Sequence, residues 1–523
     1  MRKLELVGLS VILAGFALLL GTHLDISPGL HGDEAWFGLR AQQMASGAVR
    51  SIHGMTAHSG ALFPLIVAGS FRVFGVSIWS LRAPGAACTL MAIALLTWQM
   101  WKLRQRVGSA ILLLLLLAGS VLVTAESRVA WEVTALGPLL AALLLALTLR
   151  ILEPEHRNRG RWLDATAFLV LATLGTYSHL IFLSLVAGLF VSSLTCAVRF
   201  PEYRTRSLLL VATMALANAG ALALLKVRLF AAPESDPAFA AIYAIAMALQ
   251  AIAFPRLRRR LDERLRETLA RVAAPLRRFG PAAALVGAAA FGAVHGIPFI
   301  QTISNDVVLE RLYSVSMPWP ILAVSYAYAL LLVGAYATVL VSALRGSTPV
   351  GPLDFFLIVL PVPVAAALPV LVHPRSIRYY ILVNLALMVA LAASHALATR
   401  ARAARFLWVA LGYAVAVNAV LVPIVANRNH YDSVSPRWFA FGLRQETSAH
   451  FFPVAPVVER MRADRVREFD TREAIFIGLP LTFHLSLEDW KATPGRKSAV
   501  DYDYSLLGGI RYRLIAEPVR APR

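Results

Sequence analysis

The sequence predicts an all-helical protein that crosses the membrane many times and ends in a small external α/β domain. Hydrophobic residues make up 58% of the 523 residues and charged residues only 15%, whereas about 25% of the residues of a soluble domain are charged. Apolar runs of about 20 residues, long enough to cross a bilayer as a helix, recur along the chain. Basic residues gather between alternate runs, which is typical of loops on the cytoplasmic side.

The apolar runs predict about thirteen membrane-spanning helices. Because the first run follows the basic residues MRK and lacks a small-residue cleavage site, it is interpreted as a retained anchor with a cytoplasmic N-terminus. Thirteen spans would then place the C-terminal tail outside. The spans are expected near residues 5–21, 80–101, 109–124, 133–149, 162–178, 180–198, 207–224, 238–254, 281–297, 321–344, 353–372, 379–399 and 406–426.

The distribution of charge tests this topology. Loops expected on the opposite side, near 125–132, 298–320 and 373–378, hold only one or two basic residues each. The tail 427–523 carries 15 Lys and Arg against 12 Asp and Glu, so most of the formal charge of +20 lies among the spans and does not indicate nucleic-acid binding. The proposed cytoplasmic loops are all basic: 102–106, 150–161, 199–206, 256–278 and 400–405.

Residues 61–76 are apolar, but counting them as a span would invert every later loop. Because the segment is short and carries Arg72, it predicts a helix lying in the outer interface. The first external loop then covers 22–79, within a membrane domain of residues 1–426. The external domain covers 427–523, where residues 472–487 alternate like a strand and 456–469 have helical spacing.

Ionisable side chains gather at the outer ends of the spans, and the stretch 32–47, GDEAWFGLRAQQMASG, is one such place. One interpretation is an interfacial helix that begins at Glu34, is capped by Asp33 and turns an apolar face toward lipid. Two carboxylates are more than a cap needs, however. A carboxylate beside a low-dielectric boundary tends to hold a proton, which suits a general base.

These residues carry a family resemblance. DEAWFG (33–38) resembles the Asp-Glu motif in the first external loop of the GT-C glycosyltransferases, notably the protein O-mannosyltransferase and aminoarabinose (lipid A) transferase superfamily. Residues 126–147 resemble a later motif of that family, with Glu132 where an aspartate is common, and 375–387 resemble its late RY motif without the proline. The stretch 58–87 matches the pattern at Pro64-Leu65, Phe74-Gly75, Trp79, Arg82 and Pro84.

The resemblance implies a GT-C fold and an inverting glycosyltransferase of the bacterial inner membrane. Such an enzyme takes a sugar from a polyprenyl-phosphate donor and passes it to an external acceptor, which can be a glycan, a lipid or a protein. Asp33 is expected to be the base, with Glu34 supporting it or binding a cation.

The donor phosphate is expected to be held by basic side chains, because Arg makes bidentate contacts with phosphate oxygens. Arg375, Arg378 and Tyr379 are the predicted clamp, with contact to lipid headgroups as the alternative for the two arginines. The other predicted pocket residues are Arg128, Glu132, Lys226, Arg228 and His58, of which His58 stands near the position where lipid A transferases carry the Lys of a Lys-Pro-Pro motif.

Two questions stay open at this level. Histidines and carboxylates on the outer side suit a divalent cation, yet no HxH or HxxxH spacing names a ligand set, and Cys88 and Cys196 suggest neither a disulfide nor a zinc site. A transporter or flippase for a lipid-linked or amphiphilic substrate is the alternative function, although charge near the middle of the spans is scarce. A membrane scaffold whose tail binds an external partner is a third possibility.

Overall fold

The computed structural model describes most of residues 2–217 and 286–394, together with shorter stretches of the C-terminal region. Within the two long ranges it does not describe 26–27, 50–53, 57–58, 105–106, 154–157, 204–205, 208, 211–212, 215–216, 288, 314, 347–349 and 372–376. Beyond residue 394 it describes 411–412, 415, 437–438, 444–445, 466–471, 478–486, 493–494, 500–505 and 511–518.

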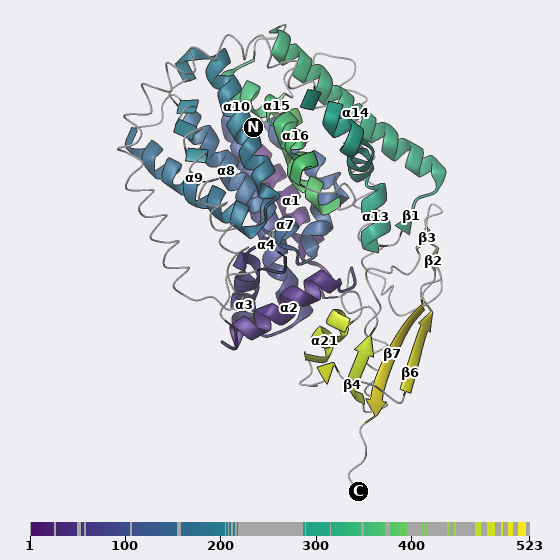
Figure 1. Cartoon of the computed structure of the whole chain (residues 1–523). Helices are drawn as coiled ribbons and strands as arrows, with labels where there is room; N and C mark the ends of the chain where they lie inside the picture. The colour runs from purple at the N-terminus through teal and green to yellow at the C-terminus, as the bar shows by residue number, and fades with distance from the viewer. Residues whose placement is uncertain are drawn as a thin grey trace.

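The described part of residues 2–394 is a helical bundle with short crossing helices at one end (Figure 1). Five of its helices are long and apolar enough to cross a membrane, or six if one bent pair counts as a span. The predicted spans 207–224, 238–254 and 406–426 lie wholly or mostly outside the described residues. The main helices are α1 (Arg2–Gly21), α4 (Ile78–Arg104), α5 (Val107–Ala118), α8 (Gly137–Leu152), α9 (Asn158–Ser178), α10 (Phe182–Arg199), α14 (Trp319–Arg345), α15 (Pro352–Val359), α16 (Pro361–Leu371) and α17 (Ile381–Ala393).

The predicted span 109–124 is broken rather than straight. After α5 the chain bends by 78° into α6 (Val121–Thr124) and the 3-10 helix η1 (Glu126–Arg128). Asn305 stabilises the break: its amide nitrogen donates to the carbonyl of Gly119, its amide oxygen accepts from the N–H of Val121, and both distances are 2.9 Å. Backbone groups freed at a break within a membrane need such partners.

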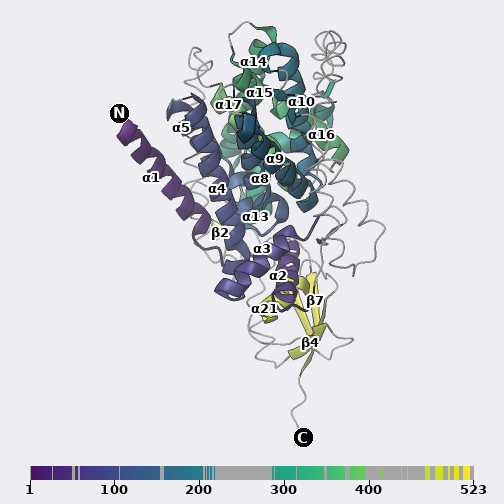
Figure 2. The ribbon, with the colours of Figure 1, turned by 90° about the vertical axis from the view of Figure 1, so that its left-hand side faces the viewer.

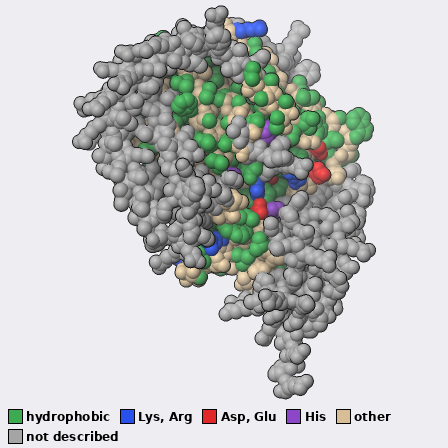
Figure 3. Space-filling model, in the orientation of Figure 1, with side chains coloured by type: hydrophobic (Ala, Val, Ile, Leu, Met, Phe, Trp, Pro, Cys, Tyr) green, Lys and Arg blue, Asp and Glu red, His purple; other side chains and the backbone are tan. Residues whose placement is uncertain are grey.

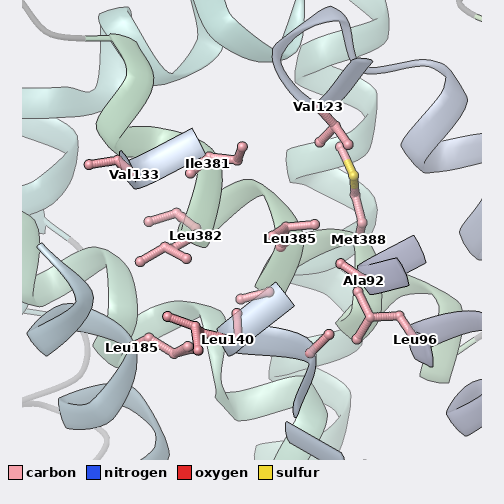
Figure 4. Close-up of a cluster of buried hydrophobic side chains, with 14 of the residues drawn as sticks. Ala92, Leu96, Val123, Val133, Leu140, Leu185, Ile381, Leu382, Leu385 and Met388 are labelled. Carbon is pink, nitrogen blue, oxygen red and sulfur yellow. The ribbon is translucent and has the colours of Figure 1, made fainter. Parts of the chain in front are cut away.

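Helix α17 lies at the centre of the bundle core (Figure 4). It is buried along its whole length, and its residues are therefore apolar on every face, whereas a surface helix is apolar on one face only. In a membrane such contacts stabilise through close packing, because lipid is as apolar as the protein core. Ile381, Leu382, Leu385 and Met388 of α17 lie among Ala92 and Leu96 of α4, Val123 of α6, Val133 of α7 (Glu132–Ala135), Leu140 of α8 and Leu185 of α10.

Three of the predicted basic loops, 102–106, 150–161 and 199–206, meet at one end of the bundle, and the other two lie outside the described residues. Lys102 in the last turn of α4 forms an ion pair with Glu153, which follows α8, at 3.7 Å. The guanidinium of Arg206 donates to the carbonyl of Leu152 at 3.1 Å, and a Cβ on Gly346 would lie 2.9 Å from a guanidinium nitrogen of Arg199. The start of α1 lies toward this end, and the strands of the C-terminal region lie at the other (Figure 2).

Helices α2 (Gly32–Ala45) and α3 (Leu62–Phe74) cross the end of the bundle opposite the basic loops (Figure 1). With 13 residues, α3 is too short to span a bilayer. Its Arg72 donates to the carbonyls of Ala45 and Met44, which caps the end of α2. The expected apolar face of α2 is only partly a lipid face, because Met44 is buried within the protein, as are Ala35 and Phe37.

The described strands of the C-terminal region form two small sheets, one of which includes β1 from the segment between α13 (Asp306–Tyr313) and α14. β1 (Val315–Ser316), β3 (Arg444–Gln445) and β2 (Arg437–Trp438) are antiparallel in the order β1-β3-β2. The second sheet has the order β5-β4-β7-β6, with β4 (Val466–Thr471), β5 (Thr493–Pro494), β6 (Val500–Ser505) and β7 (Arg511–Pro518). β4 and β5 are parallel, and helix α21 (Leu479–Ser486) lies between them in sequence.

Two predictions for this tail were wrong in the described residues. The strand expected over 472–487 is a helix from Leu479 to Ser486, and the helix expected over 456–469 gives way to strand β4 from Val466. The domain boundary at residue 426 stays a prediction. The remaining short elements are η2 (Pro201–Tyr203), α13 (Asp306–Tyr313) and η3 (Ile377–Tyr380), and an apolar helix covers Ala289–Ile303.

Candidate functional site

Helix α2 carries Asp33 in its first turn, but Asp33 is not the cap. The N-cap is His31, whose Nδ1 accepts from the N–H of Asp33 at 3.1 Å, while Glu34 accepts from the N–H of His31 at 3.4 Å. This is a capping box in which an imidazole takes the place of the usual hydroxyl. The predicted Asp33 cap and the helix start at Glu34 were therefore wrong, and the Asp33 carboxylate is available for other contacts.

Asp33 meets Arg378, a residue 345 positions later in the chain. The guanidinium donates through Nη1 to the Asp33 carboxylate at 2.8 Å; the Arg378 side chain is 25% exposed and the Asp33 side chain 17%. Arg378 lies on η3, the single turn before α17. Its guanidinium lies 4.8 Å from the ring centre of Trp131 and 5.5 Å from that of Tyr379, within the range of cation–π attraction.

Glu34 points elsewhere and is fully buried. Its carboxylate forms a two-point ion pair with Arg82 at 2.6 and 2.7 Å and accepts from the N–H of Ala130 at 2.9 Å. Arg82 is also buried, and it donates to the carbonyls of Leu24, Pro28 and Gly29. The pair therefore ties α2, α4 and the first external loop together. The predicted role of Glu34 in supporting Asp33 or binding a cation stays a prediction.

A second carboxylate, Glu132, faces a histidine beside Arg378. Oε1 of Glu132 lies 3.9 Å from Nε2 of His179, and both side chains are 10% exposed. Nδ1 of His179 accepts from the N–H of Ile181 at 3.1 Å, which assigns the ring proton of the neutral imidazole to Nε2, the nitrogen that faces Glu132. Arg378 lies close enough to act electrostatically on both Glu132 and Asp33.

The first external loop passes beside this histidine. Ser59 and His179 form an isolated antiparallel bridge, and the N–H of Gly60 donates to the carbonyl of Ser178 at 3.1 Å. A Cβ on Gly60 would lie 2.5 Å from the ring of Tyr177, so only glycine permits this approach. His179 and the ring of Tyr379 also lie 5.4 Å apart. Loops 59–60 and 177–181 thus form one wall of the site.

The structure brings Asp33, Glu132, Arg378 and Tyr379 of the predicted site together. Arg128 is 1% exposed and donates to the carbonyl of Thr22, which joins η1 to the end of α1; its role in binding the donor phosphate stays a prediction. The structure also places Trp131 and His179 there, for which the sequence offered no signal beyond the position of Trp131 directly before Glu132. The predicted residues His58, Lys226, Arg228 and Arg375 lie outside the described residues.

Charged and histidine side chains gather in a hollow beside an otherwise hydrophobic bundle surface (Figure 3). In this site the guanidinium of Arg378 contacts the carboxylate of Asp33 and lies near that of Glu132. A positive charge that can bind an anionic group therefore lies next to two carboxylates that can accept a proton. Among the residues that the structure describes, no group of three or more His, Cys, Asp or Glu side chains could hold a metal ion. The arrangement is suited to binding a phosphate and removing a proton beside it.

An apolar groove of about 500 Å³ lies near this end of the bundle, between α1, α3 and α4. Leu24 lines the groove and its carbonyl accepts from Arg82, so this residue connects the groove lining with the buried ion pair. Its lining is almost wholly hydrophobic: Ala17, Leu20, Gly21, Leu24, Ile66, Ser70, Phe74, Trp79, Ala83, Pro84, Ala86, Ala87 and Leu90.

No protein-family model and no curated protein matches the sequence. The structure is similar to ArnT from Cupriavidus metallidurans bound to undecaprenyl phosphate, with a TM-score of 0.39 and 14% identity over 97% of this chain and 98% of that one. It is also similar to the apo oligosaccharyltransferase of Archaeoglobus fulgidus, with a TM-score of 0.46 and 14% identity over 81% of this chain. The chain spans 55% of that second protein.

Proposed function

We propose that this protein is a GT-C-type inverting glycosyltransferase of the bacterial inner membrane. It transfers a sugar from a polyprenyl-phosphate donor to an acceptor hydroxyl at the external face. The observation that carries the proposal is the 2.8 Å contact between Asp33 and Arg378. The predicted base, Asp33, and the predicted phosphate-binding residue, Arg378, come from separate motifs far apart in the sequence. They lie in contact at one end of a bundle of apolar helices.

Each residue has a task in the proposed reaction. Arg378 binds the phosphate of the donor, with Trp131 and Tyr379 holding its guanidinium in place from the ring faces. Asp33 accepts the proton of the acceptor hydroxyl as the oxygen attacks the anomeric carbon. The bond from that carbon to the phosphate oxygen breaks, and its electron pair leaves with the polyprenyl phosphate. A single displacement of this kind inverts the anomeric configuration.

The other features of this end of the bundle support a lipid-linked donor. The contact with Asp33 holds the Arg378 guanidinium in an orientation in which a donor phosphate can bind it. Glu132 and His179 occupy the same site, where Glu132 lies within electrostatic reach of Arg378 and Asp33. The groove between α1, α3 and α4 suits a prenyl chain, since its lining offers almost no polar atoms.

The base assignment is tested with Asp33→Asn, which keeps the size of the side chain and removes its basicity. In a strain lacking the protein, we expect a polyprenyl-phosphate sugar to accumulate, as measured by mass spectrometry of extracted lipids. The wild-type gene clears this lipid and Asp33→Asn does not. In vitro, transfer from the purified lipid falls by about 10²–10⁴-fold.

Asp25→Asn is the matched control, because Asp25 is an exposed carboxylate in the same external loop. It should clear the lipid as the wild type does. Wild-type turnover by Asp33→Asn would contradict the assignment of the base, and absence of any accumulating lipid would contradict the donor class.

A further inference from the structure

Phe483 of α21 is fully buried against the helix that carries Asp33. A Cβ on Gly38 of α2 would lie 2.3 Å from Cε2 of the Phe483 ring, so the ring occupies the space that any other residue would need. Glycine is unfavourable in a helix interior, and Gly38 does not adopt a positive φ. The close approach of Phe483 is therefore the structural reason for a glycine at this position.

Further contacts surround this ring. The amide nitrogen of Gln42, one turn after Gly38, donates to the hydroxyl of Ser486 at 2.8 Å. Phe71 of α3 stacks on Phe483 with ring centres 6.5 Å apart. Since Gly38 and Gln42 lie on the same face of α2, α21 packs along that helix and reaches α3 as well.

The C-terminal region contacts the membrane part of the chain at a second site, through a pair of strands. β3 pairs with β1, which follows α13 directly, through the register Val315 to Gln445 and Ser316 to Arg444. In the sequence, helix α21 lies between strands β4 and β5, which pair with each other. The region is thus attached to α2 near the start of the chain and to the segment between α13 and α14 (Figure 1).

We propose that Phe483 is a positioning residue of the active site: by filling the space at Gly38, α21 holds α2 where Asp33 reaches Arg378. The inference rests on the proposed function, since it assigns a role in the transfer reaction. Asp33 lies five residues before Gly38 on the same rigid helix, so a rotation or shift of α2 displaces its carboxylate. The C-terminal region is in this sense a working part of the transferase.

A displacement of about 1 Å at a catalytic group can cost about 10²-fold in rate. Phe483 does not line the groove, and the rings beside Arg378 in the described residues are those of Trp131 and Tyr379. Loss of its contact should therefore lower kcat by about 10–100-fold and leave the KM for the donor within about 3-fold.

The experiment uses the full-length protein with Gly38→Ala, Phe483→Ala and the double variant. The donor is the polyprenyl-phosphate sugar purified from the strain lacking the protein, and the acceptor is that strain's membranes. The readout is release of polyprenyl phosphate. Gly69→Ala is the matched control, because Gly69 lies within α3 and a Cβ there meets nothing within 4 Å. Amide hydrogen exchange over 479–486 reports whether α21 remains docked.

For both single variants we expect faster hydrogen exchange in α21 and a lower kcat, with an unchanged KM for the donor. The Gly69→Ala control should have the exchange rate and kcat of the wild type. The double variant should be no worse than Phe483→Ala, because both changes act through one contact. Faster exchange with unchanged kcat overturns the positioning role, and unchanged exchange in both variants overturns the docking contact. If wild-type protein transfers no sugar, the proposed function fails instead.

Discussion

Asp33 and Glu34 are neighbours in sequence, yet their carboxylates carry out different tasks. Glu34 turns inward to a buried guanidinium, whereas Asp33 turns toward Arg378 at the partly exposed site. The cause is the cap: because His31 occupies the N-cap, Glu34 takes the third helical position and reaches back under the first turn. Glu34 therefore fixes the helix from which Asp33 projects.

A stability measurement separates these two tasks. Glu34→Gln leaves the guanidinium of Arg82 buried without its counter-charge, and breaking a buried pair in this way costs about 3–5 kcal/mol. We expect a clear fall in the thermal unfolding midpoint of the detergent-purified protein. Glu310→Gln, at an exposed carboxylate on α13, is the control and should leave the midpoint unchanged. An unchanged midpoint for Glu34→Gln would contradict a structural role for the pair.

The site was predictable from sequence only where a motif singled out a residue. Asp33, Glu132 and Arg378 each lay in a recognisable stretch, and the structure brings them together. Trp131 and His179 could not be predicted, because their roles arise from segments packed side by side in space. The Arg82 partner of Glu34 lies 48 residues away, and nothing in the local sequence indicates that pairing.

At the scale of elements, α21 shows why the periodicity of the tail misled. Leu479, Leu481, Phe483 and Leu485 alternate with other residues as in a strand. The segment is a helix that is buried on more than one face, because it packs on α2 as well as α3. A short helix in such a place does not show a single apolar stripe. Pairing of β4 with β7 likewise overrides the helical spacing over 466–469, the described part of the predicted helix.

The groove between α1, α3 and α4 can be tested by filling it. Ala87 lines the groove and is exposed, so Ala87→Trp occupies the space without disturbing the core. Displacing two methylenes of a bound chain costs about 1.6 kcal/mol, which is more than 10-fold in affinity. We expect the donor KM to rise by about that factor with kcat near the wild-type value.

Ala337→Trp serves as the control for this prediction, because Ala337 is an exposed residue of α14 away from the groove. It adds the same ring to the surface and should leave both constants unchanged. If Ala87→Trp behaves like this control, the prenyl chain lies elsewhere. A fall in kcat alone would also place the groove outside donor binding.

At the scale of the whole molecule, the alternation of basic loops predicted which ends of the helices meet. The contacts between Lys102 and Glu153 and between Arg206 and Leu152 join three of these loops at one end. The site lies at the other end, with Asp33, Glu132 and Arg378. The charge of the loops could be used for this prediction because it reflects how the helices insert into the membrane. The 78° break after α5 could not be predicted in this way, because it depends on Asn305, a residue 184 positions away from Val121.

This topology predicts which residues are accessible from outside the cell. Asp25 is exposed near the site end, and the Lys102 side chain is 51% exposed at the basic end. A membrane-impermeant maleimide should label Asp25→Cys in intact spheroplasts and Lys102→Cys only after permeabilisation. The wild type should stay unlabelled, because Cys88 and Cys196 are both buried. Labelling of Lys102→Cys in intact spheroplasts would reverse the orientation and place Asp33 and Arg378 on the cytoplasmic side, where an external acceptor could not reach them.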